Sequence, residues 1–182
     1  MEELQKERTY TYEEWASWDE SIRCELVDGE LVMMSQPTQA HQEILGELFG
    51  QLWQFLKGKP CKVIPAPFGV RLSDKEESVF EPDIVVVCDP AKLDGKVCNG
   101  APDMIIEILS PSTSRHDKFV KFHKYQKAGV REYWIVDPDS KTVSVHLLKG
   151  GEYVVNAYAD TDTAPVHVLD GCNIVLGDVF AG

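Results

Sequence analysis

Two acidic residues interrupt apolar runs that have the character of buried β-strands. Asp83 opens the run 83–88, and Glu107 lies inside the run 103–109. An ionised carboxylate in an apolar layer is costly unless a cation or a hydrogen-bond donor meets it. If the two runs form an antiparallel hairpin whose paired residue numbers sum to 190, Asp83 lies opposite Glu107 on the same face of the sheet.

Convergent carboxylates repel each other unless they share a proton or hold a cation. Ligands that are all oxygens favour a hard divalent ion, Mg²⁺ or Mn²⁺. Such an ion could activate a water molecule and stabilise the charge that develops in phosphodiester hydrolysis. Two other interpretations stay open: both acids are solvated at the rim of the sheet, or Glu107 pairs with a lysine of the following helix.

A basic segment follows the second of these strands. It contains one acid, Asp117, in a chain whose net charge is −12. Its six basic residues are Arg115, Lys118, Lys121, Lys124, Lys127 and Arg131. A solvated helix face explains such a run without any function. Beside a nuclease site, the same run forms a local phosphate-contact face on an acidic protein.

Turn and capping signals predict the elements that position these residues. Thr11 caps a short helix, and Asp28-Gly29 turns a hairpin over 24–34. Apolar residues at three- and four-residue steps predict a helix over 38–56. Short β-rich runs follow at 63–72, 83–88, 103–109, 132–136, 142–148 and 153–158.

One helix, over 115–128, interrupts the β-rich runs, with Ser114 as its expected N-cap. Together with strands 103–109 and 132–136 it predicts a βαβ unit with parallel strands. We therefore expect an α/β fold, a mixed β-sheet flanked by helices, with extra β-strands at the sheet edge after Ala159. We expect the 182 residues, 1–182, to form a single domain.

Composition narrows the class of protein. The chain contains no apolar run of the ~20 residues that a membrane span requires, and its first eight residues are too charged for a signal peptide. We therefore expect a cytoplasmic protein that makes no membrane contact. Its five cysteines include no Cys-x-x-Cys pair, so we expect reduced packing residues, with neither a zinc site nor disulfides.

The order Pro82-Asp83 followed by Glu107 resembles the PD-(D/E)XK nuclease signature, in which two acids bind the metal. Leu109 stands where that signature has a lysine. Over about residues 11–148 the chain is also similar to the "Uma two" family of restriction-endonuclease-like proteins, a branch of that superfamily. The stretches that carry this resemblance are Glu25–Glu30, His41-Gln42, Glu81–Val87, Pro102–Thr113, Asp117, Lys121, Tyr125 and Ala128–Pro138.

The resemblance implies a restriction-endonuclease-like fold in which a lysine of the following helix replaces the missing strand lysine; Lys121 is at the matching position. Helix geometry alone leaves two lysines open. At about 100° per residue, Phe119, Phe122 and Tyr125 form the face expected to pack on the sheet. Lys118 falls inside that arc and Lys121 at its rim, so Lys118 stays the second candidate.

Three further residues are candidates for the site. His41 shares the apolar face of its helix, where a histidine is more often a hydrogen-bonded packing residue than a site residue. Glu25 is a possible further acid. The carbonyl of Ile108 is a possible third metal ligand beside Asp83 and Glu107.

The predicted function is metal-dependent hydrolysis of phosphodiester bonds in DNA, with Asp83 and Glu107 holding Mg²⁺ or Mn²⁺. Lys121 is expected to orient water or help to deprotonate it. A chain of this size is expected to form a homodimer to cut both strands. Two alternatives stay open: an inactive binding or regulatory module of the same fold, favoured by the missing strand lysine and the acidic surface, and a phosphohydrolase acting on RNA or nucleotides.

Overall fold

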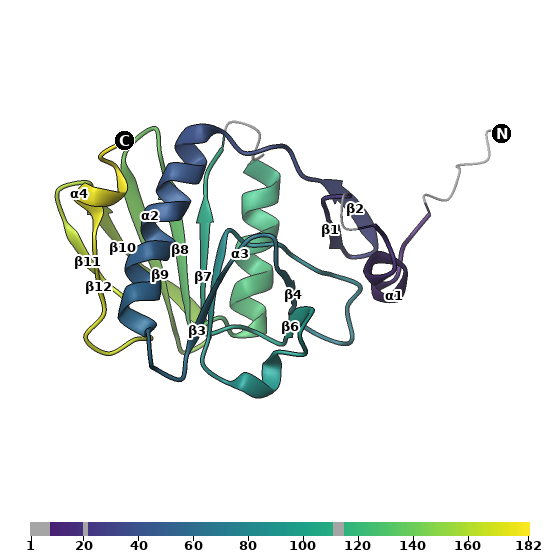
Figure 1. Cartoon of the computed structure of the whole chain (residues 1–182). Helices are drawn as coiled ribbons and strands as arrows, with labels where there is room; N and C mark the ends of the chain where they lie inside the picture. The colour runs from purple at the N-terminus through teal and green to yellow at the C-terminus, as the bar shows by residue number, and fades with distance from the viewer. Residues whose placement is uncertain (1–7, 20–21, 111–114) are drawn as a thin grey trace.

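A central sheet of six strands, in the order β10-β9-β8-β7-β5-β3, organises the computed structural model of the protein (Figure 1). The structure describes residues 8–19, 22–110 and 115–182, and for 115–117 the backbone alone. Strands β7 and β8 are parallel, and all other neighbours are antiparallel. The strands are β3 (Lys62–Pro65), β5 (Ile84–Val87), β7 (Met104–Ile108), β8 (Glu132–Asp137), β9 (Thr142–Lys149) and β10 (Glu152–Ala159).

The register between β5 and β7 confirms the predicted hairpin. Ile84 pairs with Ile106 and Val85 with Ile105, so the paired numbers sum to 190. Asp83 directly precedes β5, and Glu107 is the fourth residue of β7. The two acids therefore lie at the same end of the sheet. The loop between the strands, however, holds a 3₁₀ turn, η1 (Pro90–Lys92), and a short strand, β6 (Val97–Asn99), which periodicity did not reveal.

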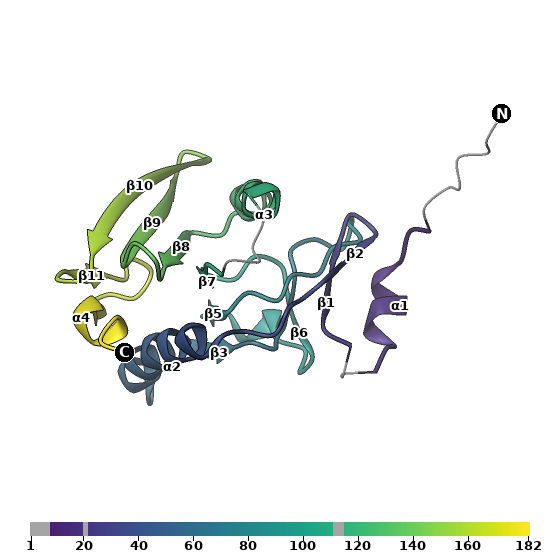
Figure 2. The same ribbon diagram turned by 90° about the horizontal axis from the view of Figure 1, so that it is seen from above.

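Two long helices cover opposite faces of this sheet (Figure 2). Helix α2 (Gln39–Leu56) begins where predicted, and the Thr38 hydroxyl accepts the His41 N–H. Its residues Ile44, Leu48 and Leu52 pack into one core with strand residues of β5 and β7. Helix α3 (Arg115–Ala128) covers the other face, where Tyr125 is fully buried. The predicted βαβ unit is confirmed, while its expected cap, Ser114, lies outside the described residues.

A separate hairpin lies beside the α3 face of the sheet. Strands β1 (Cys24–Val27) and β2 (Glu30–Met33) join through Asp28 and Gly29, whose φ angles of 51° and 85° are those of a tight hairpin turn. Helix α1 (Tyr12–Ala16) precedes the hairpin and has the expected capping box at Thr11. The backbone of Leu26 bridges to Val79, which holds the hairpin against the segment that leads into β5.

The predicted run 63–72 is wrong as one strand. It divides into β3 and β4 (Gly69–Arg71), and β4 pairs in parallel with β6 in a sheet of two strands. The close approach of β4 to Val97 of β6 explains why residue 69 is a glycine. A Cβ atom on Gly69 would lie 2.8 Å from Val97 Cγ1. Val70 is thereby buried in the core under α3.

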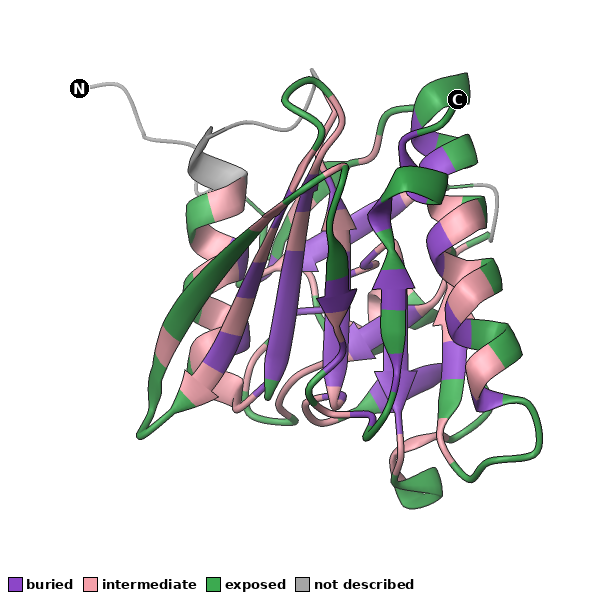
Figure 3. Ribbon diagram, turned by 90° about the vertical axis from the view of Figure 1, so that its left-hand side faces the viewer, coloured by how far each residue is buried: buried purple, intermediate pink, exposed green. Residues whose placement is uncertain are grey.

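The prediction of edge strands after Ala159 is also wrong. Strands β11 (Thr163–Pro165) and β12 (Asn173–Val175) pair with each other, and α4 (Leu176–Val179) follows them. This segment packs apolar residues into the core under α2 instead of extending the sheet. The buried Glu132 helps to fix it, because its Oε2 accepts the Val168 N–H. The sheet edge itself is β10, which is largely exposed (Figure 3).

The expectation that all cysteines are reduced is wrong for one pair. Cys61 and Cys88 form a disulfide. They flank the paired residues Lys62 and Val87 of β3 and β5, so strand register brings them together. Cys24, Cys98 and Cys172 are free and buried, as expected of packing residues. Among the described residues, no helix has the length and apolar character that a membrane span requires.

Candidate active site

A pocket of about 350 Å³ opens at the end of the sheet where β5 begins and β7 ends. Asp83 lies directly before β5 and Glu107 lies in β7, while the first turn of α2 supplies His41. The hairpin and α3 contribute the remaining polar walls. Six polar residues that line the pocket had been singled out from the sequence: Glu25, His41, Asp83, Glu107, Lys118 and Lys121.

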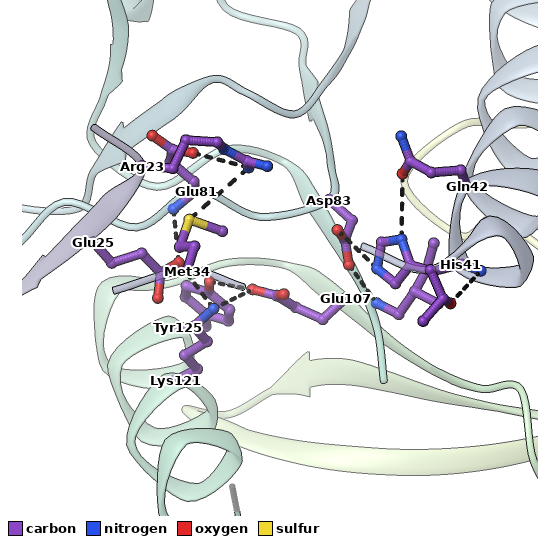
Figure 4. A network of polar contacts seen from close by, with 12 residues as sticks. Arg23, Glu25, Met34, His41, Gln42, Glu81, Asp83, Glu107, Lys121 and Tyr125 are labelled. Atoms are coloured by element: carbon purple, nitrogen blue, oxygen red, sulfur yellow. Dashed lines mark hydrogen bonds and ion pairs between the residues drawn. The ribbon is translucent and has the colours of Figure 1, made fainter. Parts of the chain in front are cut away.

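Backbone and side-chain hydrogen bonds fix the position of Asp83. Its Oδ2 accepts the N–H of Ile108 at 2.6 Å, which ties it to the residue next to Glu107. Its Oδ1 lies 3.2 Å from His41 Nε2. Figure 4 shows these contacts side by side, with Asp83 between His41 and the Glu107 strand. Ile108 lines the same pocket.

Glu107 meets two donors from α3. Lys121 Nζ lies 3.3 Å from its Oε1, and the Tyr125 hydroxyl donates to the same oxygen at 2.8 Å (Figure 4). Burial raises the pKa of Glu107 to about 8, against the opposing effect of the Lys121 charge. The nearby charges of Asp83 and Glu25 act in the same direction as burial. This carboxylate is therefore poorly compensated by the protein alone, even with a lysine beside it.

Glu25 holds Lys121 from the other side. Its Oε1 lies 2.9 Å from Lys121 Nζ and accepts the Glu81 N–H at 2.8 Å. The side chain is 3% exposed, so these contacts replace its solvation. The resemblance included Glu25, but neither periodicity nor spacing predicts that it reaches a helix lysine from the hairpin.

Two residues of the pocket were not identified as site residues from the sequence. Arg23 Nη2 lies 3.3 Å from Glu81 Oε2, and both side chains line the pocket. Burial raises the pKa of Glu81 despite the neighbouring arginine. Glu81 precedes Pro82-Asp83 directly, and that adjacency is the signal that could have identified it.

His41 is a site neighbour as well as a helix residue. Burial acts to lower its pKa, but the hydrogen bond and the charge of Asp83 outweigh burial, and the pKa of His41 is raised. The side chain is buried at the start of α2. Its contact with Asp83 distinguishes it from a histidine that only fills the core.

The donor set fits a hard divalent ion held by few protein ligands. Asp83 and Glu107 offer carboxylate oxygens at one pocket, and Mg²⁺ is commonly held by one or two carboxylates and several waters. In the part of the chain that the structure describes, no three His, Cys, Asp or Glu side chains are arranged to hold a metal. Asp83 and Glu107 therefore match a two-carboxylate site better than an all-protein cage.

The predicted phosphate-contact face on α3 is largely neutralised by ion pairs. Lys124 pairs with Asp28 and Glu76, and Lys127 also pairs with Glu76. Arg131 pairs with Asp103 outside the pocket. Of the other three basic residues, Lys121 is buried between two acids, Lys118 lines the pocket, and the Arg115 side chain lies outside the described residues.

The predicted sheet-facing arc of α3 is wrong at one end. Phe119 is 64% exposed and packs its ring against His123. Lys121, predicted at the rim of that arc, is 8% exposed and therefore lies on the buried side of α3. Glu25 and Glu107 supply the counter-charges that allow a lysine to be buried there.

Comparisons with known proteins agree with this architecture. The model of the Uma2 family, described as "Putative restriction endonuclease", matches residues 10–177. An "Uncharacterized protein slr1290" of Synechocystis sp. (strain ATCC 27184 / PCC 6803 / Kazusa) is 25% identical over 174 residues, which cover 93% of this chain and 90% of that relative.

A solved structure has the same fold. It is a crystal structure described as "a putative nuclease belonging to DUF820" from Anabaena variabilis ATCC 29413. The TM-score is 0.76 at 20% sequence identity, and the match covers 94% of this chain and 97% of that chain. The expected α/β fold of restriction-endonuclease type, with its mixed sheet, is thereby confirmed.

Proposed function

This chain belongs to the Uma2 family, and from that premise we propose that it is a divalent-metal-dependent nuclease that hydrolyses phosphodiester bonds, with DNA as its substrate. One observation carries the proposal. Asp83 and Glu107 line one pocket, where Asp83 accepts the N–H of Ile108, the residue next to Glu107, and Lys121 contacts Glu107. Two carboxylates can hold a metal ion that activates water for hydrolysis of a phosphodiester bond, and the lysine adds a positive charge beside them.

Each residue has a distinct role in the proposal. The carboxylates of Asp83 and Glu107 would hold Mg²⁺ or Mn²⁺, and the Ile108 carbonyl is a third possible ligand. When bound, the ion supplies a lowered water pKa and positive charge near the phosphate. Lys121 orients the attacking water and opposes the charge that develops on phosphate oxygens.

Three neighbours hold this set in place. The Tyr125 hydroxyl fixes Glu107, and Glu25 fixes Lys121. His41 orients Asp83 through its Nε2 atom. Loss of a partner of this kind typically lowers metal affinity or activity about 10–100-fold. Because they come from β1, α2 and α3, the whole fold is required to assemble the site.

A second candidate function is a binding or regulatory module without turnover. The position of Lys121 favours it, because the ammonium lies between Glu25 and Glu107 and supplies a positive charge to both. In that case the site binds a metal ion without turnover, or the three residues form a structural ion network that holds no metal. The two candidate functions make opposite predictions about cleavage.

A cleavage assay tests the proposed function. Wild type, Asp83→Ala, Glu107→Gln and Lys121→Ala are compared on supercoiled DNA and on linear single- and double-stranded DNA, with Mg²⁺, Mn²⁺ or EDTA. We expect cleavage that requires metal and is lost in all three variants. Binding of Mn²⁺ by titration calorimetry without cleavage by any variant or by wild type would support the inactive module instead. If Mn²⁺ is not bound either, the structural ion network is the correct assignment.

A further inference from the structure

We propose that the pocket receives an unpaired segment of a nucleic-acid strand in preference to an intact duplex. The inference rests on the proposed nuclease function and names its substrate class. It assigns one wall of the pocket, Val32, Met33 and Met34, to contact with a nucleobase, and Lys118 to contact with a phosphate. We call these three residues the apolar wall.

The charges around the pocket do not favour a surface that binds the phosphate backbone of a duplex. Duplex binding draws most of its affinity from several Lys or Arg contacts to phosphates. Near this pocket, Arg23 and Lys121 are committed to Glu81, Glu25 and Glu107. Within the described part of the chain, Lys118 is the pocket-lining lysine or arginine for which no ion pair is found.

Depth also favours a single strand. The side chains of Glu25, Asp83 and Glu107 are 3%, 16% and 14% exposed, so the acids lie at the floor of the pocket. A phosphodiester group must therefore enter the pocket to reach them. The volume of about 350 Å³ is at the small end of the range for ligand pockets, ~300–1,000 Å³, which suits a nucleotide and is far too small for a duplex.

The apolar wall supplies a surface that an unpaired base can cover. Met33 is 68% exposed and Val32 is 39% exposed, and both line the pocket together with Met34. Every base has a π face, which stacking hides in a duplex and which is free in an unpaired strand. The methionine thioether makes favourable contacts with aromatic rings. These contacts are tolerant of base identity, so the inference predicts little sequence preference.

A second cavity gives the strand a path beyond the pocket. It has a volume of about 370 Å³ and is lined by Thr38, Asp137 and Asp139 among others. The two cavities share His41 and Lys118 as lining residues. A strand that crosses from one cavity to the other therefore passes a phosphate beside the ammonium of Lys118.

The test compares matched substrates and matched surface variants. Wild type, Met33→Ser and Lys118→Gln act on single-stranded DNA, single-stranded RNA and a blunt duplex of one sequence, with Mn²⁺. Val155→Ser is the control, because Val155 is 56% exposed on β10 and does not line either cavity. Both changes replace an exposed apolar side chain by serine, one at the pocket and the other away from both cavities.

We expect single strands to be cleaved at least about tenfold faster than the duplex. Met33→Ser should lower kcat/KM about two- to tenfold, chiefly through KM, as expected for the loss of one contact between a thioether and an aromatic base. Lys118→Gln should reduce the slope of log affinity against log salt by about 1. Val155→Ser should match wild type. The relative cleavage rates of single-stranded DNA and RNA show which sugar the site prefers. Either preference supports the binding of an unpaired strand, provided that the single strand is cleaved faster than the duplex.

Two results would contradict the preference for an unpaired strand without contradicting the proposed nuclease function. They are equal cleavage rates for duplex and single strands, or equal kcat/KM values for Met33→Ser and Val155→Ser. Failure of the proposed function looks different. In that case no substrate is cleaved, and wild type is indistinguishable from Asp83→Ala.

Discussion

The Lys121 ammonium lies 3.3 Å from Glu107 Oε1, and both side chains are largely buried. The same ammonium lies 2.9 Å from Glu25 Oε1, so one positive charge faces two carboxylates. Asp83 adds a further acid nearby. Lys121 is therefore shared between two buried acids, and its contribution to stability can be measured with and without metal.

Lys121→Met should destabilise the metal-free protein strongly. Removal of one partner of a buried ion pair costs about 3–5 kcal/mol, because the other charge stays buried. Urea unfolding in EDTA at pH 8 measures the free energy of unfolding. The matched control is Lys127→Met, whose side chain is 75% exposed; surface pairs are worth about 0–1 kcal/mol. Equal losses in the two variants would contradict the buried network.

Stability of the metal-free protein should fall as pH rises from about 5 to 8. Burial raises the pKa of Glu107 from 4.5 to about 8, so the folded state binds a proton more tightly than the unfolded state does. That contribution is complete below pH 4.5 and is lost as pH rises through the folded pKa. The raised pKa values of Glu81 and His41 act in the same direction.

Melting temperatures in EDTA across this pH range provide the measurement. Glu107→Gln should show a flatter dependence on pH than wild type, because the amide does not titrate. A wild-type melting temperature that rises steadily from pH 5 to 8, or a variant with an unchanged slope, would be inconsistent with a buried, poorly compensated Glu107.

Tyr125→Phe should slow cleavage as well as reduce stability. The change removes the 2.8 Å hydrogen bond to Glu107, at a cost of about 1–3 kcal/mol. Tyr153→Phe is the control, since its hydroxyl donates to the Val130 carbonyl, away from the pocket. Urea unfolding should show losses of similar size, while the cleavage assay should show a slower rate for Tyr125→Phe alone. Equal rates would mean that Tyr125 serves the core and not the site.

His41→Gln should weaken Mn²⁺ binding. His41 Nε2 contacts Asp83 Oδ1, and partners that orient a metal ligand typically contribute 10–100-fold to affinity. Titration calorimetry gives the dissociation constant. His146→Gln is a suitable control, because His146 is also partly buried and hydrogen-bonds to the Tyr133 carbonyl outside the proposed ligand set. An unchanged dissociation constant for Mn²⁺ in His41→Gln would show that His41 does not contribute to the metal site.

Local sequence patterns predict most of the secondary-structure elements that carry this site. Turn and capping signals predict the β1–β2 hairpin at Asp28-Gly29 and the start of α2 at Thr38. These two features depend on residues close in sequence, so the chain specifies them without reference to the rest of the fold. The two apolar runs predict buried strands, and their spacing is compatible with a hairpin in which Asp83 lies opposite Glu107. Because both strands are apolar on both faces, the sequence does not select that register, and the tertiary structure decided it.

Packing between segments that are distant in the sequence decided the contacts that complete the site. Glu25 reaches Lys121 and Cys61 meets Cys88 only because particular elements lie side by side. Helix periodicity identifies apolar positions, so it did not predict that Lys121 is buried more deeply than Phe119. The burial of Lys121 depends on the carboxylates of Glu25 and Glu107, which only the assembled tertiary structure brings to it.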